Sequence, residues 1–370
     1  MINHINLRYP IGIDIGRGEL HAVQLKQTAK GFAVRGLFHL KLSGEPDSNP
    51  EEGENLVSAL KSLLRVRRFK GKKAVVHIPS RHTLTFPIRI QVGKAETLEE
   101  AILRESVKHL TFPIEKAIFD YPSITPASAE DDNAFDAIVI AVNRDVISEY
   151  LSWMGRAGFI VEAFDCGVSS LIRLHHHFYD PSPNPVILCH AGNDESLITV
   201  IMKDRILAQR SIPWCMDTLS ERIAANLSLK DRDKTLFILK EHGLAYTQDR
   251  ESGDLAAEAK KDQELVKMNR AIYQIITPYI DELIHEFLKM ISYIRMGGAM
   301  AAPDSIFLYG LTALIRRLDR YIENRINIPV AVVNPLTKVA LSQGVLLDDL
   351  SKGAPFALTL GLAMRKIPWL

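Results

Sequence analysis

Short apolar runs separated by turn residues open the chain. Residues 11–15, 20–25 and 32–40 are rich in β-branched and other apolar side chains, and glycines lie in the gaps between them. This pattern predicts three strands of an antiparallel meander. A polar loop over 44–53 and an amphipathic helix over 55–64 are expected to follow.

A second unit is predicted between residues 73 and 160. The expected strands cover residues 74–78, 83–92, 117–121 and 137–142. Thr97 followed by Glu100 has the capping-box spacing, which predicts the start of a helix. Asn143 is expected to cap a second helix that reaches residue 157. The order strand, strand, helix, strand, strand, helix predicts a small α+β module.

The opening meander recurs after a linker. Asp180 to Pro185 reads DPSPNP, a composition typical of a break between domains, and three more strands are predicted at 186–190, 196–203 and 205–212. The recurrence predicts two similar domains. The strongest helical periodicity comes later, where Thr277 is expected to cap a helix with Pro278 in its first position.

Composition narrows the functional classes. The 370 residues carry a formal net charge of +1, which gives no global attraction to nucleic acid or an anionic membrane. The three cysteines form no CxxC pair, which predicts a reducing compartment. Neither a signal peptide nor an apolar run of membrane-spanning length is recognised, so we expect a cytoplasmic protein without direct membrane insertion.

The segment Gly12 to Gly16 is the first candidate site. A strand ending in Asp-x-Gly, followed by a tight turn and a returning strand, places backbone N–H groups where they can hold phosphate. Asp14 could then hold a hydrated Mg²⁺ ion. A β-turn with a polar aspartate explains the same residues, so the motif alone does not decide between the two interpretations.

Further segments, in order along the chain, carry a family resemblance. They are residues 100–108, 110–114, 119–121, 157–159 with 165, Arg210, 239–244, 277–295, 334–335 and 361–365. Together with the opening hairpin, this set resembles the PilM-like type IV pilus assembly proteins of the actin/FtsA-like ATPase superfamily. The resemblance implies an α/β, actin-like (ribonuclease H-like) duplicated two-domain fold with an inserted α+β module of the 1C (SHS2-like) type.

The implied domain boundaries follow the predicted elements. Residues 8–72 form the first part of domain 1, 73–160 the inserted module, 161–183 the continuation of domain 1, 184–338 domain 2 with a helical, polar subdomain near 216–298, and 339–370 the return to domain 1. The resemblance also implies a groove beside the module that takes the cytoplasmic N-terminal peptide of a PilN-like inner-membrane protein. Arg81, Phe86, Arg89 and Arg104 are the candidate groove residues.

In this family ATP binds between the two halves. The matching nucleotide positions are Asp14, Gly16, Gly192, Lys240 and Gly310, with Asp14 acting through Mg²⁺. Four departures at separate elements are expected to weaken the site. In the first turn Glu19 adds negative charge and His21 stands where the family has lysine, and in the second hairpin His190 replaces the acid. The segment 213–215 (PWC) replaces a Gly-Gly pair and Leu311 replaces a glycine, whereas Asp194 remains as a nearby acid.

The resulting hypothesis is a cytoplasmic scaffold, recruited to the inner face of the inner membrane by its partner, with no cofactor and no enzymatic activity beyond a very weak ATPase. The alternatives are an ATP-binding PilM-like protein regulated by its nucleotide state, an actin-like kinase, and an FtsA-like filament protein, for which the C-terminal residues leave no room for a membrane helix.

The basic run 65–73 is expected to be a solvated helix end rather than a nucleic-acid surface. Residues 175–177 are three adjacent histidines, which cannot converge on one metal ion from a helix.

Overall fold

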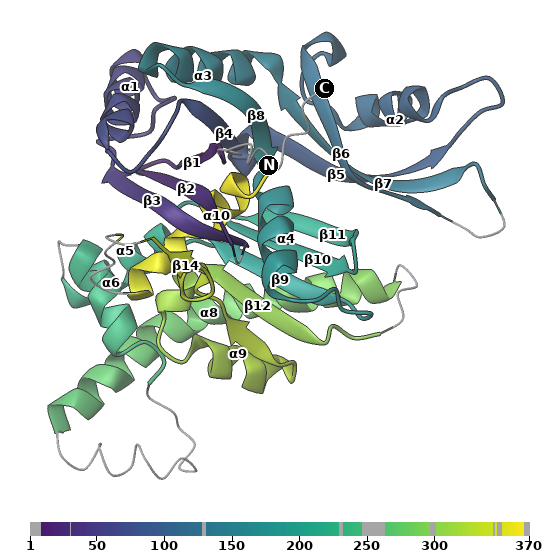
Figure 1. Cartoon of the computed structure of the whole chain (residues 1–370). Coiled ribbons are helices and arrows are strands. Elements are labelled where there is room, and N and C mark those ends of the chain that lie inside the picture. The colour runs from purple at the N-terminus through teal and green to yellow at the C-terminus, as the bar shows by residue number, and fades with distance from the viewer. Residues whose placement is uncertain are drawn as a thin grey trace. The chain divides into compact units, whose positions relative to one another are not determined.

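The computed structural model describes residues 9–29, 31–127, 131–228, 232–245, 263–296, 301–342, 345 and 350–365 (Figure 1). The chain divides into two compact units. Unit 1 contains residues 1–183, 199–210 and 335–370, and unit 2 contains residues 184–198 and 211–334. Each unit is built around β-structure with helices packed against it.

Unit 1 contains a six-stranded sheet with the order β14-β3-β2-β1-β4-β8. Its strands are β1 (Ile11–Ile15), β2 (Glu19–Thr28), β3 (Gly31–Lys41), β4 (Lys73–Ile78), β8 (Ile160–Cys166) and β14 (Ala340–Leu341). The pairs β1–β2 and β2–β3 are antiparallel, as the predicted meander requires. The pairs β1–β4, β4–β8 and β3–β14 are parallel.

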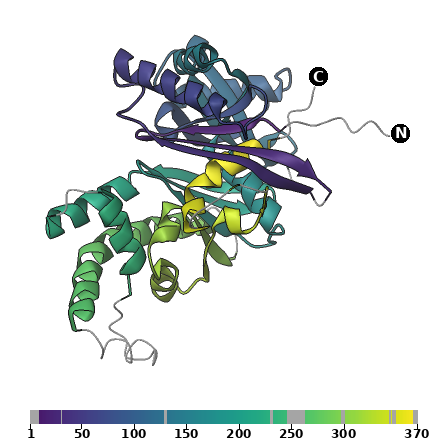
Figure 2. The same ribbon diagram turned by 60° about the vertical axis from the view of Figure 1, so that its left-hand side comes forward.

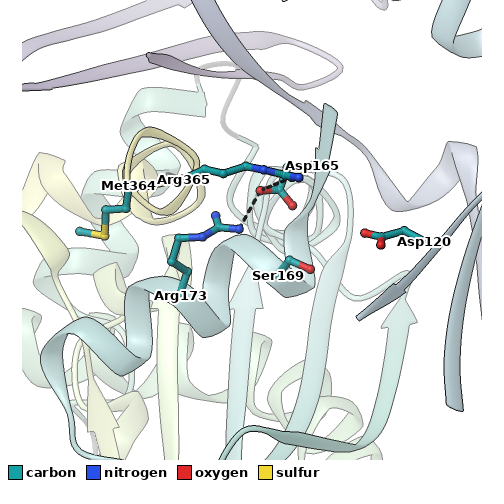
Figure 3. A pocket seen from close by; sticks show the side chains of 6 residues that line it. All are labelled: Asp120, Asp165, Ser169, Arg173, Met364 and Arg365. Carbon is teal, nitrogen blue, oxygen red and sulfur yellow. Dashed lines mark hydrogen bonds and ion pairs between the residues drawn. The ribbon is translucent and has the colours of Figure 1, made fainter. Parts of the chain in front are cut away.

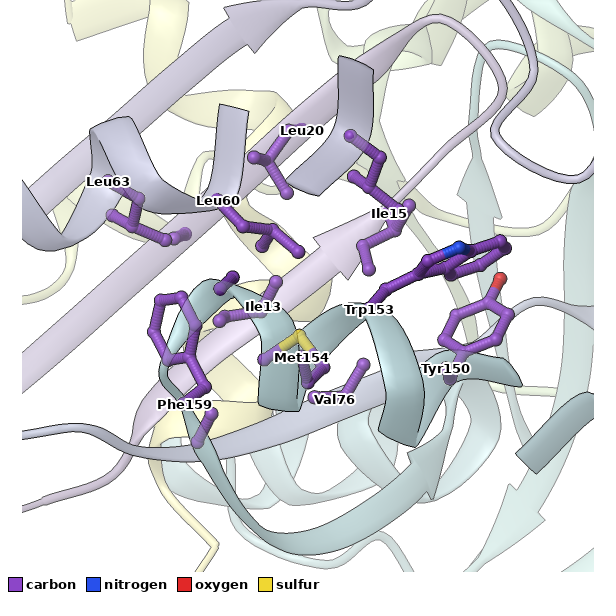
Figure 4. Packing of buried hydrophobic residues seen from close by; sticks show 14 of the residues in the cluster. Ile13, Ile15, Leu20, Leu60, Leu63, Val76, Tyr150, Trp153, Met154 and Phe159 are labelled. Atoms are coloured by element: carbon purple, nitrogen blue, oxygen red, sulfur yellow. The ribbon is translucent and has the colours of Figure 1, made fainter. Parts of the chain in front are cut away.

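One face of this sheet is covered by α1 (Pro50–Arg65) and α3 (Arg144–Ala157) (Figure 4). Side chains alternate along a strand, so Ile11, Ile13 and Ile15 of β1 all enter this core. The helices contribute their own large apolar residues, among them Leu60, Leu63, Tyr150, Trp153 and Met154. At about 25 cal/mol per Å² of buried apolar surface, this is the main stabilising contact of unit 1.

The opposite face is covered by α10 (Ala357–Ala363), which lies against β1 and β2 in Figure 2. The approach is close enough that a Cβ atom at Gly12 would lie 2.3 Å from the carbonyl oxygen of Thr359. Helix α10 also packs on α4 (Gly167–Phe178). The η6 segment (Leu350–Phe356) precedes α10.

Between β4 and α3 the chain forms a separate three-stranded antiparallel sheet with the order β5-β7-β6. Its elements are β5 (Thr83–Gln91), α2 (Leu98–Ser106), β6 (Ala117–Pro126) and β7 (Ala134–Asn143). The predicted capping box is confirmed: the Glu100 N–H donates to Thr97 Oγ1, and the Thr97 N–H donates to Glu100 Oε2. Helix α2 covers one face of this sheet, where Phe86, Ile88 and Ile90 are buried.

The structure divides the segment 73–160, which the sequence assigned to a single module. Strand β4 pairs with β1 and β8, and α3 packs on α1, so both belong with the six-stranded sheet. Only residues 83–143 form the three-stranded sheet and its helix, called the inserted module below. Strand β4 is buried on both faces from Ala74 to Ile78, as a central parallel strand is, and this explains its place.

A five-stranded sheet has the order β11-β10-β9-β12-β13. Its strands are β9 (Val186–Ala191), β10 (Ser196–Met202), β11 (Arg205–Ile212), β12 (Ser305–Gly310) and β13 (Val330–Val332). Strand β12 pairs in parallel with β9 and β13. This order repeats the order β3-β2-β1-β4-β8 of the first sheet, so the internal duplication predicted from the sequence is confirmed in the two sheets.

The helices of unit 2 are α5 (Met216–Leu227), α6 (Arg232–Glu241), α8 (Gln263–Met296) and α9 (Leu318–Ile326). The predicted start of the long helix at Thr277 is wrong, because α8 begins at Gln263 and continues through Pro278. A proline inside a helix removes one backbone hydrogen bond, and the apolar stripe around Tyr279 and Leu283, which is fully buried, offsets that loss. None of the helices in the described ranges is long and apolar enough to cross a membrane.

Candidate functional site

The turn between β1 and β2 holds Asp14 and Gly16. The N–H of Gly16 donates to the carbonyl oxygen of Glu19 over 2.9 Å and closes the turn. Oδ1 of Asp14 lies 2.8 Å from Nδ1 of His77 on β4, and 18% of the Asp14 side chain is exposed. Asp14 therefore binds an imidazole of the neighbouring strand, and a Mg²⁺ ion at this carboxylate would have to share or replace that contact.

Asp14 and His77 belong to a row of polar side chains that crosses the sheet. His39, His21 and Asp14 are register partners on β3, β2 and β1, and His77 and Asp165 are partners on β4 and β8. Directly paired residues point to the same face of a sheet, so all five share one face. We call these five residues the polar row. It lies on the face opposite the core formed with α1 and α3, since Ile13 and Ile15 alternate with Asp14.

Glu19 is directed toward this row. Its Oε2 lies 3.7 Å from Nε2 of His21 and 3.6 Å from Nε2 of His39, and the side chain is 12% exposed. The two imidazole rings are stacked, with centroids 4.7 Å apart. Burial lowers the pKa of His21 below its ordinary value, an effect that the charges of Glu19 and Asp14 partly oppose. Glu19 is thus held against two imidazoles.

The second hairpin, between β9 and β10, has the same turn geometry. The N–H of Gly192 donates to the carbonyl oxygen of Glu195 over 2.9 Å. The first N–H groups of α5 are already used here: Met216 donates to Gly192 over 3.1 Å and Asp217 to Asn193 over 2.9 Å. A phosphate at this helix N-terminus would have to displace those carbonyl oxygens.

Gly310 ends β12 next to His190. Its φ of +75° lies in the left-handed region, and a Cβ atom here would lie 2.4 Å from the carbonyl oxygen of Ala191 and 3.0 Å from Nε2 of His190. Only glycine fits this position. The His190 ring is 92% buried against it, and the following Leu311 is buried as well. The acid expected at position 190 is therefore replaced by an imidazole packed against the backbone.

Trp214 lies in the segment where the resemblance implied two glycines. Its ring stacks on Tyr279 of α8 at a centroid distance of 4.9 Å, and its Nε1 donates to the carbonyl oxygen of Tyr279 over 2.7 Å. The Tyr279 hydroxyl accepts the N–H of Cys215 over 2.8 Å. A buried indole with this many contacts fixes the strand-to-helix connection before α5.

The predicted nucleotide residues are divided between the units. Asp14 and Gly16 belong to unit 1, whereas Gly192, Lys240 and Gly310 belong to unit 2. Lys240 lies in the last turn of α6, partly exposed.

The predicted groove residues lie in different surroundings, although Phe86 and Arg89 share β5 and Arg104 donates to the carbonyl oxygen of Gln91 on that strand over 3.0 Å. Phe86 is buried in the core of the inserted module, where its ring stacks on His109. Arg89 is 75% exposed and forms an ion pair with Asp136 on β7, at 2.8 Å. Arg104 pairs with Glu96 and Glu105 beside α2, and Arg81 pairs with Asp47. Each arginine is thus held by an acid within its own neighbourhood.

A cavity of about 460 Å³ lies elsewhere in unit 1 (Figure 3). It is lined by Asp120, Asp165, Ser169, Arg173, Met364 and Arg365. Asp165 ends β8 with only 1% of its side chain exposed, and Oδ2 accepts from Arg173 over 3.0 Å and pairs with Arg365 at 3.2 Å. Two cations thus surround one buried carboxylate, as the dashed lines in Figure 3 show.

The two arginines are positioned by the backbone. Nη1 of Arg173 donates to the carbonyl oxygen of Gly361 over 2.8 Å, and Nη1 of Arg365 donates to that of Phe164 over 3.2 Å. The Asp165 carboxylate also accepts the Cys166 N–H over 3.0 Å. Both guanidinium groups are about one third exposed, so they lie between the chain's own acid and solvent.

The inserted module forms the other side of the cavity. Asp120 lies on β6, an edge strand, directly opposite Ile140 on β7. The register shifts between Asp120 and Ser123, so a bulge bends the strand here. Ile118 lies two residues before Asp120 on the same face and is 37% exposed. The cavity thus places the Asp120 carboxylate of β6 opposite a mostly charged wall from α4, β8 and the segment after α10, and Ile118 lies on the same face of β6 as Asp120.

Comparison with known proteins identifies the family. The model of the family described as "Type IV pilus assembly protein PilM" matches residues 12–234 and 245–367. The chain belongs to this family. Asp14, Gly192 and Gly310 lie within the matched ranges.

Solved structures agree on the fold. A structure described as the PilM–PilN type IV pilus biogenesis complex is 20% identical, covers 96% of this chain and 98% of its own, and has a TM-score of 0.74. The ethanolamine utilization protein EutJ from Carboxydothermus hydrogenoformans is 13% identical, covers 96% of this chain and 89% of its own, and has a TM-score of 0.51. The fold is the α/β, actin-like fold that the sequence indicated.

The cavity was not predicted from the sequence, although most of its lining residues belong to segments that were singled out there. Asp120, Asp165, Met364 and Arg365 all lie in segments that carried the family resemblance. A shared location could have been inferred for Asp165 and Arg173, because a strand end and the helix that follows it are neighbours. Arg365 could not be placed, since nothing local ties it to β8.

The adjacent histidines 175–177 and the pair of His21 and His39 differ in whether their side chains come close to one another. His175 stacks on Tyr179, His176 lies 3.8 Å from Asp204, and His177 packs on Phe32, so the adjacent histidines do not converge. Among the described residues, one group has the spacing of metal ligands, and it was not predicted: Glu19, His21 and His39.

Proposed function

We propose that this chain is a scaffold of a type IV pilus or a related secretion machinery, and that it binds the cytoplasmic N-terminal peptide of a PilN-like inner-membrane protein. The partner would hold it at the inner face of the inner membrane. Nucleotide binding is weakened or lost in this proposal, and no catalytic role is assigned. Membership of the PilM family and the similarity to a PilM–PilN complex support the partner.

The cavity between the inserted module and β8 is the observation that carries the proposal. Arg173 and Arg365 each have five N–H donors, and their contacts with Asp165, Gly361 and Phe164 use only some of them. The remaining donors suit backbone carbonyl groups or a carboxylate of a peptide. Asp120, on the opposite wall, suits a peptide N–H group or a basic side chain.

The module adds two features that favour an extended peptide over a small molecule. Strand β6 is an edge strand, which leaves one row of backbone groups outside the sheet ladder. Ile118 and Ile124 are each 37% exposed on this strand. An extended segment with alternating apolar and polar residues matches such a surface.

A binding experiment on the full chain tests this. The probe is a labelled synthetic peptide of the N-terminal cytoplasmic segment of the PilN-like protein from the same source. Asp120→Asn and Arg365→Gln each remove one charged contact, so each should weaken binding about tenfold to a hundredfold. Arg89→Gln, on the same module but outside the cavity, is the matched control and should bind as the unaltered chain does.

Two results would contradict the proposal. One is unchanged affinity in both cavity variants while thermal unfolding shows them folded. The other is a loss of binding in Arg89→Gln alone. That result would place the peptide against Arg89 on β5, as the groove residues expected from the sequence imply.

Nucleotide binding should be weak because several groups of the expected nucleotide site already have partners within the chain. Asp14 is bound to His77, and the first N–H groups of α5 are bound to Gly192 and Asn193. His190 fills the place of the second acid against Gly310. Asp14 and the first N–H groups of α5 would therefore have to give up an existing partner before they could hold a Mg²⁺–triphosphate.

ATP binding remains the second candidate function, because one observation favours it. The turns after Gly16 and Gly192 close with the same hydrogen bond at the same length of 2.9 Å, so both phosphate hairpins keep their backbone geometry. Calorimetry with Mg²⁺-ATP distinguishes a scaffold with weak or no nucleotide binding from an ATP-binding protein. We expect no binding, or a Kd weaker than about 1 mM, which corresponds to about 4 kcal/mol of binding free energy. Micromolar affinity that Asp14→Ala abolishes would establish the second candidate.

A further inference from the structure

Glu19, His21 and His39 form a compact group on the polar-row face of unit 1. Glu19 and His21 are two residues apart on β2 and so share a face, and His39 is the register partner of His21 on β3. One possible ligand atom from each lies within 4.8 Å of the others. The group therefore comes from two adjacent strands whose spacing the sheet ladder fixes.

The distances within the group do not correspond to hydrogen bonds. Oε2 of Glu19 lies 3.7 Å from Nε2 of His21 and 3.6 Å from Nε2 of His39, beyond the usual limit for N–H···O contacts. Ligand atoms about 2.0–2.1 Å from a tetrahedral zinc ion are about 3.4 Å apart. The separation of 3.7 Å between Glu19 Oε2 and His21 Nε2 is closer to that spacing than to a hydrogen bond.

We propose that Glu19, His21 and His39 bind a divalent transition-metal ion of the zinc class, with one coordination position left for water. Two imidazoles and a carboxylate are ligands that such ions prefer over Mg²⁺ or Ca²⁺. The site lies on β2 and β3, away from the peptide cavity on β8 and β6. The metal-binding test therefore does not depend on whether the proposed peptide binding is correct.

The surroundings support a cation. Asp14 is the register partner of His21 and adds a second negative charge beside the group. The Phe356 ring meets His21 edge-on at 5.3 Å and holds its orientation. Lys41 is the register partner of Glu19, so a metal ion would compete with its ammonium group for the Glu19 carboxylate.

Binding requires one movement. The two rings are stacked with an angle of 15° between them, so their Nε2 lone pairs run side by side rather than converging. His21 is buried, whereas the side chain of His39 is 41% exposed. His39 therefore rotates out of the stack to complete the site, and His21 and Glu19 form its fixed part.

Calorimetric titration of the chelator-treated full chain with ZnCl₂ tests the site. We expect one ion per chain with micromolar or tighter affinity. His39→Gln and Glu19→Gln should each weaken binding at least tenfold, and both changes preserve side-chain volume. His285→Gln, which alters an exposed histidine of α8, is the matched control and should not change the affinity.

Cobalt provides a second readout, which reports the coordination geometry. Co²⁺ bound by two imidazoles, a carboxylate and a water should give the strong visible d–d absorption of a four-coordinate ion in the unaltered chain and in His285→Gln, and only the weak absorption of the aqueous ion in His39→Gln. The proposal is overturned if no ion binds, or if His39→Gln binds zinc as tightly as the unaltered chain. Thermal unfolding of each variant without metal shows that it is folded.

Discussion

A buried histidine gives unit 1 a specific response to acid. His175 lies on α4 with 3% of its surface exposed, and its ring stacks on Tyr179 at a centroid distance of 4.9 Å. Burial, with a smaller contribution from His176, lowers the pKa of His175 to about 4. The ordinary value in an unfolded chain is about 6.5. Between these values the unfolded chain binds a proton that the folded chain does not.

This difference predicts a loss of stability below pH 6.5. The contribution of His175 is fully present above pH 6.5 and is lost as the pH falls toward 4, so lowering the pH from 7 to 5 should cost about 2 kcal/mol. His175→Phe keeps the ring stack and should flatten the pH dependence by about that amount. Denaturant unfolding at both pH values measures it, and an unchanged slope in the variant would refute the assignment.

Individual residues were predictable only where their partners are close in sequence. Thr97 and Glu100 were recognised as a capping box because both ends of the interaction lie in one helical turn. Glu19 was expected beside a triphosphate, and its actual neighbour His39 could not be foreseen, because it comes from another strand. Register sets such contacts, and a local pattern does not fix register.

Among the elements, α10 and α4 cross with their backbones close together. A Cβ atom at Gly361 would lie 2.2 Å from the carbonyl oxygen of Ser170. The Ser170 hydroxyl donates to the carbonyl oxygen of Leu358 over 2.7 Å and joins the two helices. Glycine at 361 is therefore required by the distance between two backbones.

Two glycine substitutions should thus have opposite effects. Gly361→Ala forces the helices apart and should cost about 3 kcal/mol, the upper range of overpacking penalties. Gly155→Ala changes a glycine of α3 that has no atom within 4 Å of the new Cβ, and it should gain about 0.5–1 kcal/mol from helix propensity. Thermal unfolding compares them. Equal shifts in both variants would show that propensity, rather than the crossing, decides.

Element types were predicted better than element ends. The strands of both meanders lie within a few residues of their predicted positions. Helix α1 begins at Pro50, five residues before its predicted start, although Asn49 and Pro50 are a cap and a first-position proline. The reverse error occurred at Pro278, where the same proline signal was taken as a start and α8 continues through it.

At the scale of the whole molecule, the duplicated strand order could be predicted because the same run of short strands occurs twice. The limits of the inserted module could not. Helix α3 has the amphipathic pattern of any surface helix, and only its contact with α1 shows that it belongs to the six-stranded sheet. The place of α3 with the six-stranded sheet depends on long-range packing, which cannot be inferred from a local sequence pattern.

The module should be removable without unfolding the rest of unit 1. Thr83 and Val142 are register partners at its base, so their Cα atoms lie about 5 Å apart. Replacing residues 84–141 by a short Gly-Ser linker should preserve a cooperative thermal transition and abolish peptide binding. Circular dichroism and the peptide assay measure the two effects. Loss of the cooperative transition would mean that the six-stranded sheet needs the module to fold.

The position of α10 has a consequence for the order in which the protein is made. All seven of its residues are buried, and its backbone touches Gly12 on the first strand of the sheet. On a ribosome that adds about 5–20 residues per second, tens of seconds pass between the synthesis of β1 and that of α10. Throughout that interval the face of the sheet that contains Gly12 is not covered by α10, which is still to be made. Unit 1 should therefore complete its fold late in translation, and a stalled or truncated chain should depend on chaperones to stay in solution.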